Sequence, residues 1–105
     1  MRLPSTMREY QELVGQALIE VEDLRHSAEF DEGEEWSAVY GFLDTLESEL
    51  RHLQQSLLND AYSFGSEDLP FMRVIGDVDT FMLPFKPLLE TINLTHRSGL
   101  SEAGG

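Results

Sequence analysis

Cysteine is absent from this 105-residue sequence, and basic residues are scarce. Without cysteine the chain cannot form disulfides, use a thiol as a nucleophile or bind zinc through thiolates. Seven Lys and Arg residues stand against 20 Asp and Glu residues, so the formal net charge is −13 at pH 7. Such a surface repels phosphate backbones and anionic lipids, and we therefore expect neither nucleic acid nor a membrane as a partner.

Long apolar runs are lacking as well. No segment approaches the ~18 consecutive apolar residues of a membrane span, and the first residues lack the apolar stretch of a signal peptide. Length and composition fit one all-α domain over residues 1–105, with a flexible tail at 101–105. We accordingly predict a cytoplasmic protein.

What the sequence does contain is a pair of one-sided apolar repeats. Over residues 34–59 apolar side chains recur at steps of three and four, which places them on one face of an α-helix. This stripe consists of Trp36, Val39, Tyr40, Leu43, Leu46, Leu50, Leu53 and Leu57. A similar stripe spans residues 6–28, where Thr6 and Glu9 match a capping box. Because Gly33 permits a tight turn, we predict an antiparallel helical hairpin whose contacting residue numbers sum to roughly 63.

Two shorter helices are predicted to cover this hairpin, which gives a bundle-like fold of four helices. They span about 69–82 and 87–97. Asp68 is expected to cap the first of them, and Pro87 suits the first turn of the second. His96 lies near the C-terminal end of the last helix, where a cation is favoured, and Gly99 with Leu100 is typical of a glycine cap.

One spacing invites a metal interpretation. Glu49 and His52 have the Glu-x-x-His spacing of di-iron carboxylate bundles, whose ligands project into the core. On a helical wheel, however, His52 lies roughly 160° from the centre of the apolar stripe, so its imidazole should face solvent. His26 in the first helix is placed in the same way. We therefore assign no catalytic, cofactor-binding or metal-binding residue and expect no cofactor.

A metal-dependent hydrolase of nucleotides is the alternative from a different class. The pairs Glu9–Glu12 and Glu20–Asp23 resemble the acidic pairs with which all-α nucleotide pyrophosphohydrolases hold Mg²⁺ between helices. The first pair departs from that family because position 8 is Arg, where a doubled Glu is expected. A further alternative is an acidic mimic of nucleic acid that blocks a DNA-binding protein.

The acidic bias and the apolar residues outside the two stripes favour a protein-interaction surface. We predict a small, acidic, non-enzymatic module, such as an adaptor, chaperone or regulator, that binds a basic or amphipathic segment of another protein. A homodimer through the same surface is the other arrangement that exposed apolar side chains favour. The candidate surface comprises Ile19, Phe30, Glu32, Glu34, Glu35, Trp36, Phe42 and Phe64.

Overall fold

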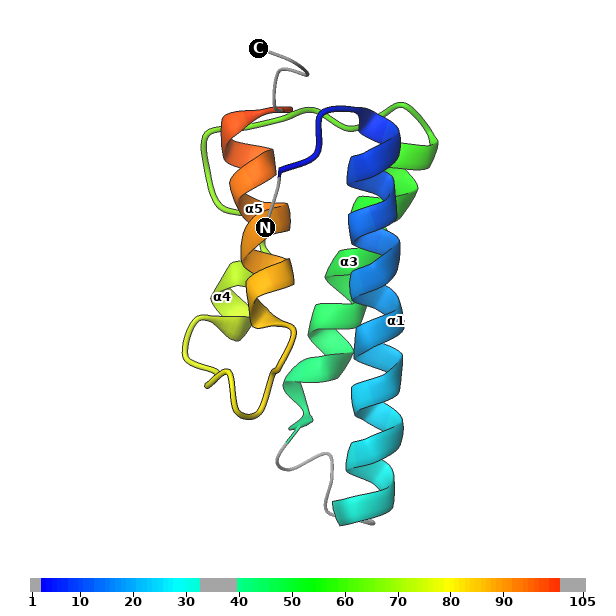
Figure 1. Ribbon diagram of the computed structural model, residues 1–105, viewed down its shortest axis with the longest axis vertical. Helices are drawn as coiled ribbons and strands as arrows, with labels where there is room; N and C mark the ends of the chain where they lie inside the picture. The colour runs from blue at the N-terminus through cyan, green and yellow to red at the C-terminus, as the bar shows by residue number, and fades with distance from the viewer. Residues whose placement is uncertain (1–2, 33–39, 101–105) are drawn as a thin grey trace.

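The computed structural model describes residues 3–32 and 40–100. These residues form four helices, and the predicted all-α, bundle-like fold is confirmed. The helices are α1 (Met7–Glu32), α3 (Phe42–Leu58), α4 (Phe71–Ile75) and α5 (Lys86–Ser98). In Figure 1, α1 and α3 lie side by side and run in opposite directions, while α4 and α5 stand beside them. The predicted tail at 101–105 lies outside the described residues.

The start of α1 contains the predicted capping box. The hydroxyl of Thr6 accepts a hydrogen bond from the backbone N–H of Glu9 at 3.1 Å. The Glu9 carboxylate accepts in return from the backbone N–H and the hydroxyl of Ser5, at 3.1 and 2.6 Å. In a simple capping box Glu9 would accept from the N–H of Thr6, whereas here it accepts from Ser5, one residue earlier. These hydrogen bonds fix the first turn of the helix.

The antiparallel hairpin is present, but its predicted register is wrong. Arg25 pairs with Asp44 at 2.7 Å, and the Gln11 amide donates to the Leu57 carbonyl at 3.4 Å, so the paired numbers sum to 69 and 68. The cause is that α1 continues to Glu32 instead of ending at residue 28. Residues 29–32 contain neither Gly nor Pro, so acidic side chains alone do not stop the helix.

The third helix is much shorter than predicted. Within the expected span 69–82, only α4 is helical, and beyond Gly76 the chain makes a series of turns up to Phe85. Asp79 promotes them because its carboxylate accepts from the Phe81 N–H at 2.8 Å, in competition with a helical bond. Lys86 then donates to the Val78 carbonyl at 2.8 Å and holds these turns against α5.

The helix α5 agrees with its prediction to within one residue at each end. Pro87 lies in the first turn, where its missing N–H costs no hydrogen bond. Gly99 has φ = +80°, and its N–H donates to the Thr95 carbonyl at 2.8 Å. This positive φ is a conformation that glycine adopts easily, and Leu100 packs against the core just beyond it.

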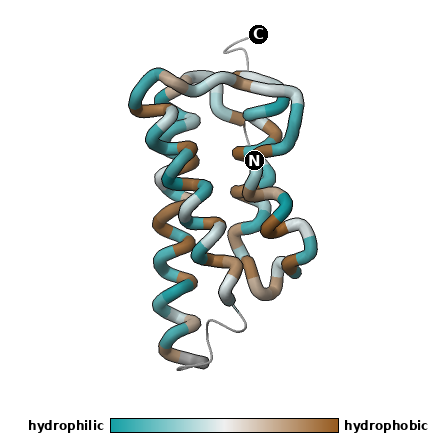
Figure 2. The backbone as a smooth tube through the Cα atoms, turned by 180° about the vertical axis from the view of Figure 1, so that it is seen from behind, coloured by the Kyte–Doolittle hydropathy of each residue, from teal (hydrophilic) through white to brown (hydrophobic). Residues whose placement is uncertain are grey.

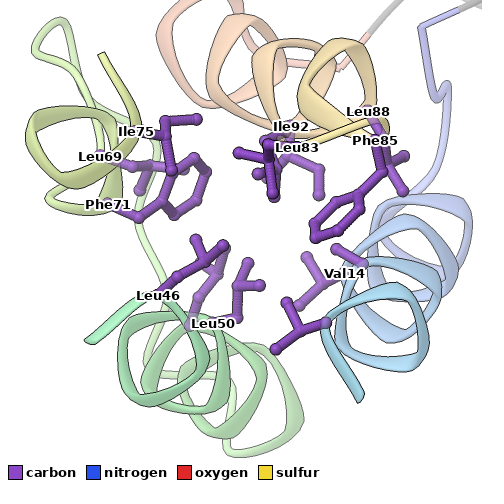
Figure 3. Packing of buried hydrophobic residues seen from close by; sticks show 14 of the residues in the cluster. Val14, Leu46, Leu50, Leu69, Phe71, Ile75, Leu83, Phe85, Leu88 and Ile92 are labelled. Atoms are coloured by element: carbon purple, nitrogen blue, oxygen red, sulfur yellow. The ribbon is translucent and has the colours of Figure 1, made fainter. Parts of the chain in front are cut away.

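Side chains from all four helices converge on one core, which Figure 3 shows in close-up. Leu46 and Leu50 of α3 are fully buried, as predicted. Although the segment after α4 is not helical, it still covers the core, since Leu83 and Phe85 are buried there. The core stripe of the hairpin is therefore covered by α4, α5 and the turns between them.

Hydrophilic and hydrophobic residues alternate along the hairpin helices, as Figure 2 shows from behind. This mixture is typical of helices with one face in a core and one in water. None of the helices in the two described ranges combines the length and the apolar character that crossing a membrane requires.

Candidate functional site

The described residues of the predicted interaction surface do not gather in one patch. Ile19 is 55% exposed in the middle of α1, and Phe30 is 89% exposed near its end. Phe64 is 38% exposed and stacks on Tyr10, with ring centroids 5.8 Å apart. Tyr10 and Phe30 are separated by roughly 30 Å along the helix, at 1.5 Å per residue. Phe64 and Phe30 therefore lie near opposite ends of α1.

Of the remaining predicted residues, the structure fully describes Phe42. Phe42 is half-buried against the core beside Tyr40, with 6.1 Å between the ring centroids. The side chain of Glu32 and all of Glu34, Glu35 and Trp36 lie outside the described part of the structure. Ile19 remains as the predicted residue that borders a groove.

This groove, which we call the outer groove, lies between α1 and α3. Its volume is about 520 Å³. The lining residues come from these two helices: Glu12, Gly15, Gln16, Leu18, Ile19 and Glu22 from α1, and Arg51 and Gln54 from α3. The outer groove therefore occupies the flank of the hairpin that α4 and α5 do not cover.

Gly15 keeps the outer groove open. A Cβ added at this residue would meet no atom within 4 Å, so no close packing demands a glycine. A glycine inside a helix costs about 1 kcal/mol relative to alanine, because it gives up more backbone freedom on folding. Gly15 is not among the residues predicted for the surface, because a single glycine within a helical pattern is tolerated and by itself indicates no function.

The charges around the outer groove are mainly negative. Glu12 and Glu22 line its α1 side, and both are exposed. Among the described residues, Arg51 is the single basic residue in its lining, and its guanidinium lies 3.7 Å from the carboxylate of Glu47. Arg8 in turn lies 3.7 Å from Glu12, so the lining keeps a small excess of negative charge beside the exposed Ile19.

A second cluster joins three parts of the chain at the other end of the hairpin. The loop before α4 carries Tyr62 and Phe64 onto Tyr10 of α1 and His96 of α5. Gly65 of the same loop donates its N–H to the His96 carbonyl at 3.2 Å. His96 lies in the last turn of α5, as predicted, but burial lowers the pKa of its imidazole and so disfavours the cationic form.

The hydrogen bonds of this cluster have one consistent proton order. The Tyr10 hydroxyl donates to the Ile92 carbonyl at 3.2 Å, so Tyr62 must supply the proton of the 3.1 Å bond between the two hydroxyls. The Tyr62 oxygen then accepts from Nδ1 of His96. Burial raises the pKa of both tyrosines, so both stay protonated at neutral pH, and the chain of bonds ties the loop to the helices.

Acidification should weaken the fold through His96. An unfolded imidazole has a pKa of about 6.5 and burial lowers that value, so the unfolded chain takes up the proton more readily. The contribution of His96 is therefore complete above about pH 6.5 and is lost as the pH falls from there through the lower pKa of the folded state. The free energy of unfolding, measured by urea denaturation, should fall less between neutral and mildly acidic pH in His96→Gln than in the wild type. Equal losses in the two proteins would contradict this role.

Three of the four acidic residues of the hydrolase alternative have local roles in the structure. Glu9 caps α1, Glu12 lies 3.7 Å from Arg8, and Glu20 accepts a hydrogen bond from Gln16 at 2.9 Å. Both His26 and His52 are exposed, as the helical wheel predicts. Among the described residues, no three His, Asp or Glu side chains lie close enough together to hold a metal ion.

No protein-family model matches the sequence, and the comparisons with curated proteins and with solved structures gave no match either.

Proposed function

We propose that this protein is a non-enzymatic interaction module that binds a basic, amphipathic helix of another protein in the outer groove. The observation that carries the proposal is the exposed Ile19 beside the open space at Gly15, with Glu12 and Glu22 along the border. An exposed apolar side chain with acidic neighbours complements a helix that has an apolar stripe flanked by Lys and Arg.

The size of the outer groove limits how the partner binds. A volume of about 520 Å³ accommodates a few anchor side chains, such as those at positions i and i+4 of the partner helix. The net charge of −13 attracts basic segments over a longer range and speeds their encounter. In this proposal the apolar anchor side chains of the partner make the contacts in the outer groove, and the negative charge of the protein favours partner helices that are basic.

Peptide selection tests this proposal directly. With the full chain as bait, a displayed library of helical peptides should enrich sequences with Leu, Ile or Phe anchors flanked by Lys and Arg. Added salt should weaken the binding of an enriched peptide without abolishing it, because screening acts on the charges and leaves the apolar contacts. Enrichment of neutral or acidic peptides would contradict the proposal.

A substitution at Gly15 distinguishes a blocked groove from a damaged fold. Gly15→Leu should stabilise α1 by about 0.5–1 kcal/mol, because leucine has a higher helix propensity and meets no neighbour at its Cβ. The same side chain fills the outer groove, so the enriched peptide should bind roughly tenfold more weakly. Isothermal titration calorimetry and thermal unfolding measure the two effects.

Thr45→Leu is the matched control. It places the same side chain on an exposed position of α3 outside the outer groove, so peptide affinity should stay unchanged. If Gly15→Leu binds the peptide as tightly as the wild type, the outer groove is not the docking site.

A further inference from the structure

A smaller cavity lies on the other side of α3, between that helix, the loop before α4 and α4 itself. Its volume is about 140 Å³. Leu53, Leu69 and Phe71 line it and are buried, whereas Glu49 and Ser56 line it and are only partly covered. Because an apolar cavity of about 150 Å³ holds a benzene molecule, this one suits a ligand of similar size.

We propose that this cavity binds a primary alkylammonium group. Among the described residues, Glu49 is the only acidic residue in its lining, and neither Lys nor Arg lines it. A carboxylate beside an apolar wall forms a strong, charge-assisted hydrogen bond with an ammonium group. The alkyl chain packs against Leu53 and Leu69.

Three polar side chains of α3 line the cavity, and each can accept a hydrogen bond from an ammonium group. Glu49 provides a carboxylate, and Ser56 provides a hydroxyl oxygen whose own proton is donated to the His52 carbonyl at 3.1 Å. His52 also lines the cavity and provides a ring nitrogen as acceptor when its imidazole is neutral. An anionic ligand would instead face the Glu49 carboxylate, and among the described residues no Lys or Arg lines the cavity to balance it.

Tyr62 gives the cavity a fixed wall. Its hydroxyl is bonded to Tyr10 and His96, so the ring is held in place and the hydroxyl is already used. Because the outer groove lies on the opposite flank of α3, this site goes beyond the proposed helix-binding function and can exist without it.

An NMR titration tests the site with defined probes. The full ¹⁵N-labelled chain is titrated with n-butylammonium chloride at constant ionic strength and mildly alkaline pH, where ordinary imidazoles are neutral. We expect saturable shifts of the amides of Leu53, Ser56, Leu69 and Phe71. Butanol should bind several-fold more weakly and butyrate not at all; equal shifts with all three probes would overturn the proposal.

Two charge-matched variants separate the site from the general acidity of the chain. Glu49→Gln should weaken n-butylammonium binding by about five- to tenfold, because it removes the charged acceptor. Glu90→Gln removes the same charge from an exposed position on α5 and should leave the binding unchanged. Equal binding by Glu49→Gln and the wild type would overturn the proposal.

A third probe identifies the source of the ammonium group. If Nα-acetyl-lysine methylamide binds as well as n-butylammonium, the cavity accepts a lysine side chain of a peptide. If only n-butylammonium binds, the ligand is a free amine, and either result supports an ammonium site. Binding by neither probe would refute it.

Discussion

Leu50→Ala should destabilise the protein by about 2–5 kcal/mol, and Leu46→Ala by a similar amount. Both leucines are fully buried and extend from α3 into the centre of the core in Figure 3. Truncation removes apolar contacts and leaves a cavity that neighbouring helices cannot fill without losing their own packing. Urea denaturation followed by circular dichroism measures the change in the free energy of unfolding.

His52→Ala is the matched control for these variants, because His52 is exposed on the same helix. Its effect should stay within about 0.5 kcal/mol of the wild type. A small effect at Leu50, or an effect of several kcal/mol at His52, would mean that α3 presents a different face to the core.

Asn93→Leu should destabilise the protein by about 1–3 kcal/mol, the cost of leaving a buried polar group without a partner. Asn93 of α5 is buried and accepts a hydrogen bond from the Leu69 N–H at 2.7 Å. Its amide donates to the Asp68 carboxylate at 2.9 Å. Leucine has a similar size but can neither accept nor donate, so the segment just before α4 would lose two hydrogen bonds to α5 and keep the contact between Asp68 and Arg97 at 3.3 Å.

Hydrogen exchange identifies the bond responsible. The Leu69 amide should lose protection in Asn93→Leu and keep it in Asp68→Asn, which retains a side-chain oxygen as acceptor for Asn93. If the Leu69 amide is equally protected in both variants, the bond to Asn93 is not what holds the start of α4.

Local patterns along the sequence predict much of this fold. The stripes that contain Val14 and Leu50 identify the core faces of α1 and α3, because spacing along a helix determines which side chains share a face. Thr6 and Gly99 mark helix ends correctly, since a cap depends on residues within one turn of itself. Apolar spacing does not predict the short extent of α4. The Asp79 carboxylate accepts from the Phe81 N–H, and this bond competes with the hydrogen bonds of a helix.

The candidate sites could be predicted only in part. Ile19 was identified as an apolar residue off the stripe, but the open space at Gly15 depends on where α3 lies. The bond between Tyr10 and Tyr62 joins residues 52 positions apart, and the bond from Tyr62 to His96 spans 34. Periodicity within one helix contains no information about such pairings.

The most direct test of the docking claim is to map an enriched basic peptide onto the ¹⁵N-labelled protein by chemical-shift perturbation. If the peptide docks in the outer groove, the largest chemical-shift changes should occur at the amides of Gly15, Ile19 and Glu22 in α1 and of Gln54 in α3. Changes confined to other surfaces, with these four amides unaffected, would show that the partner helix docks elsewhere.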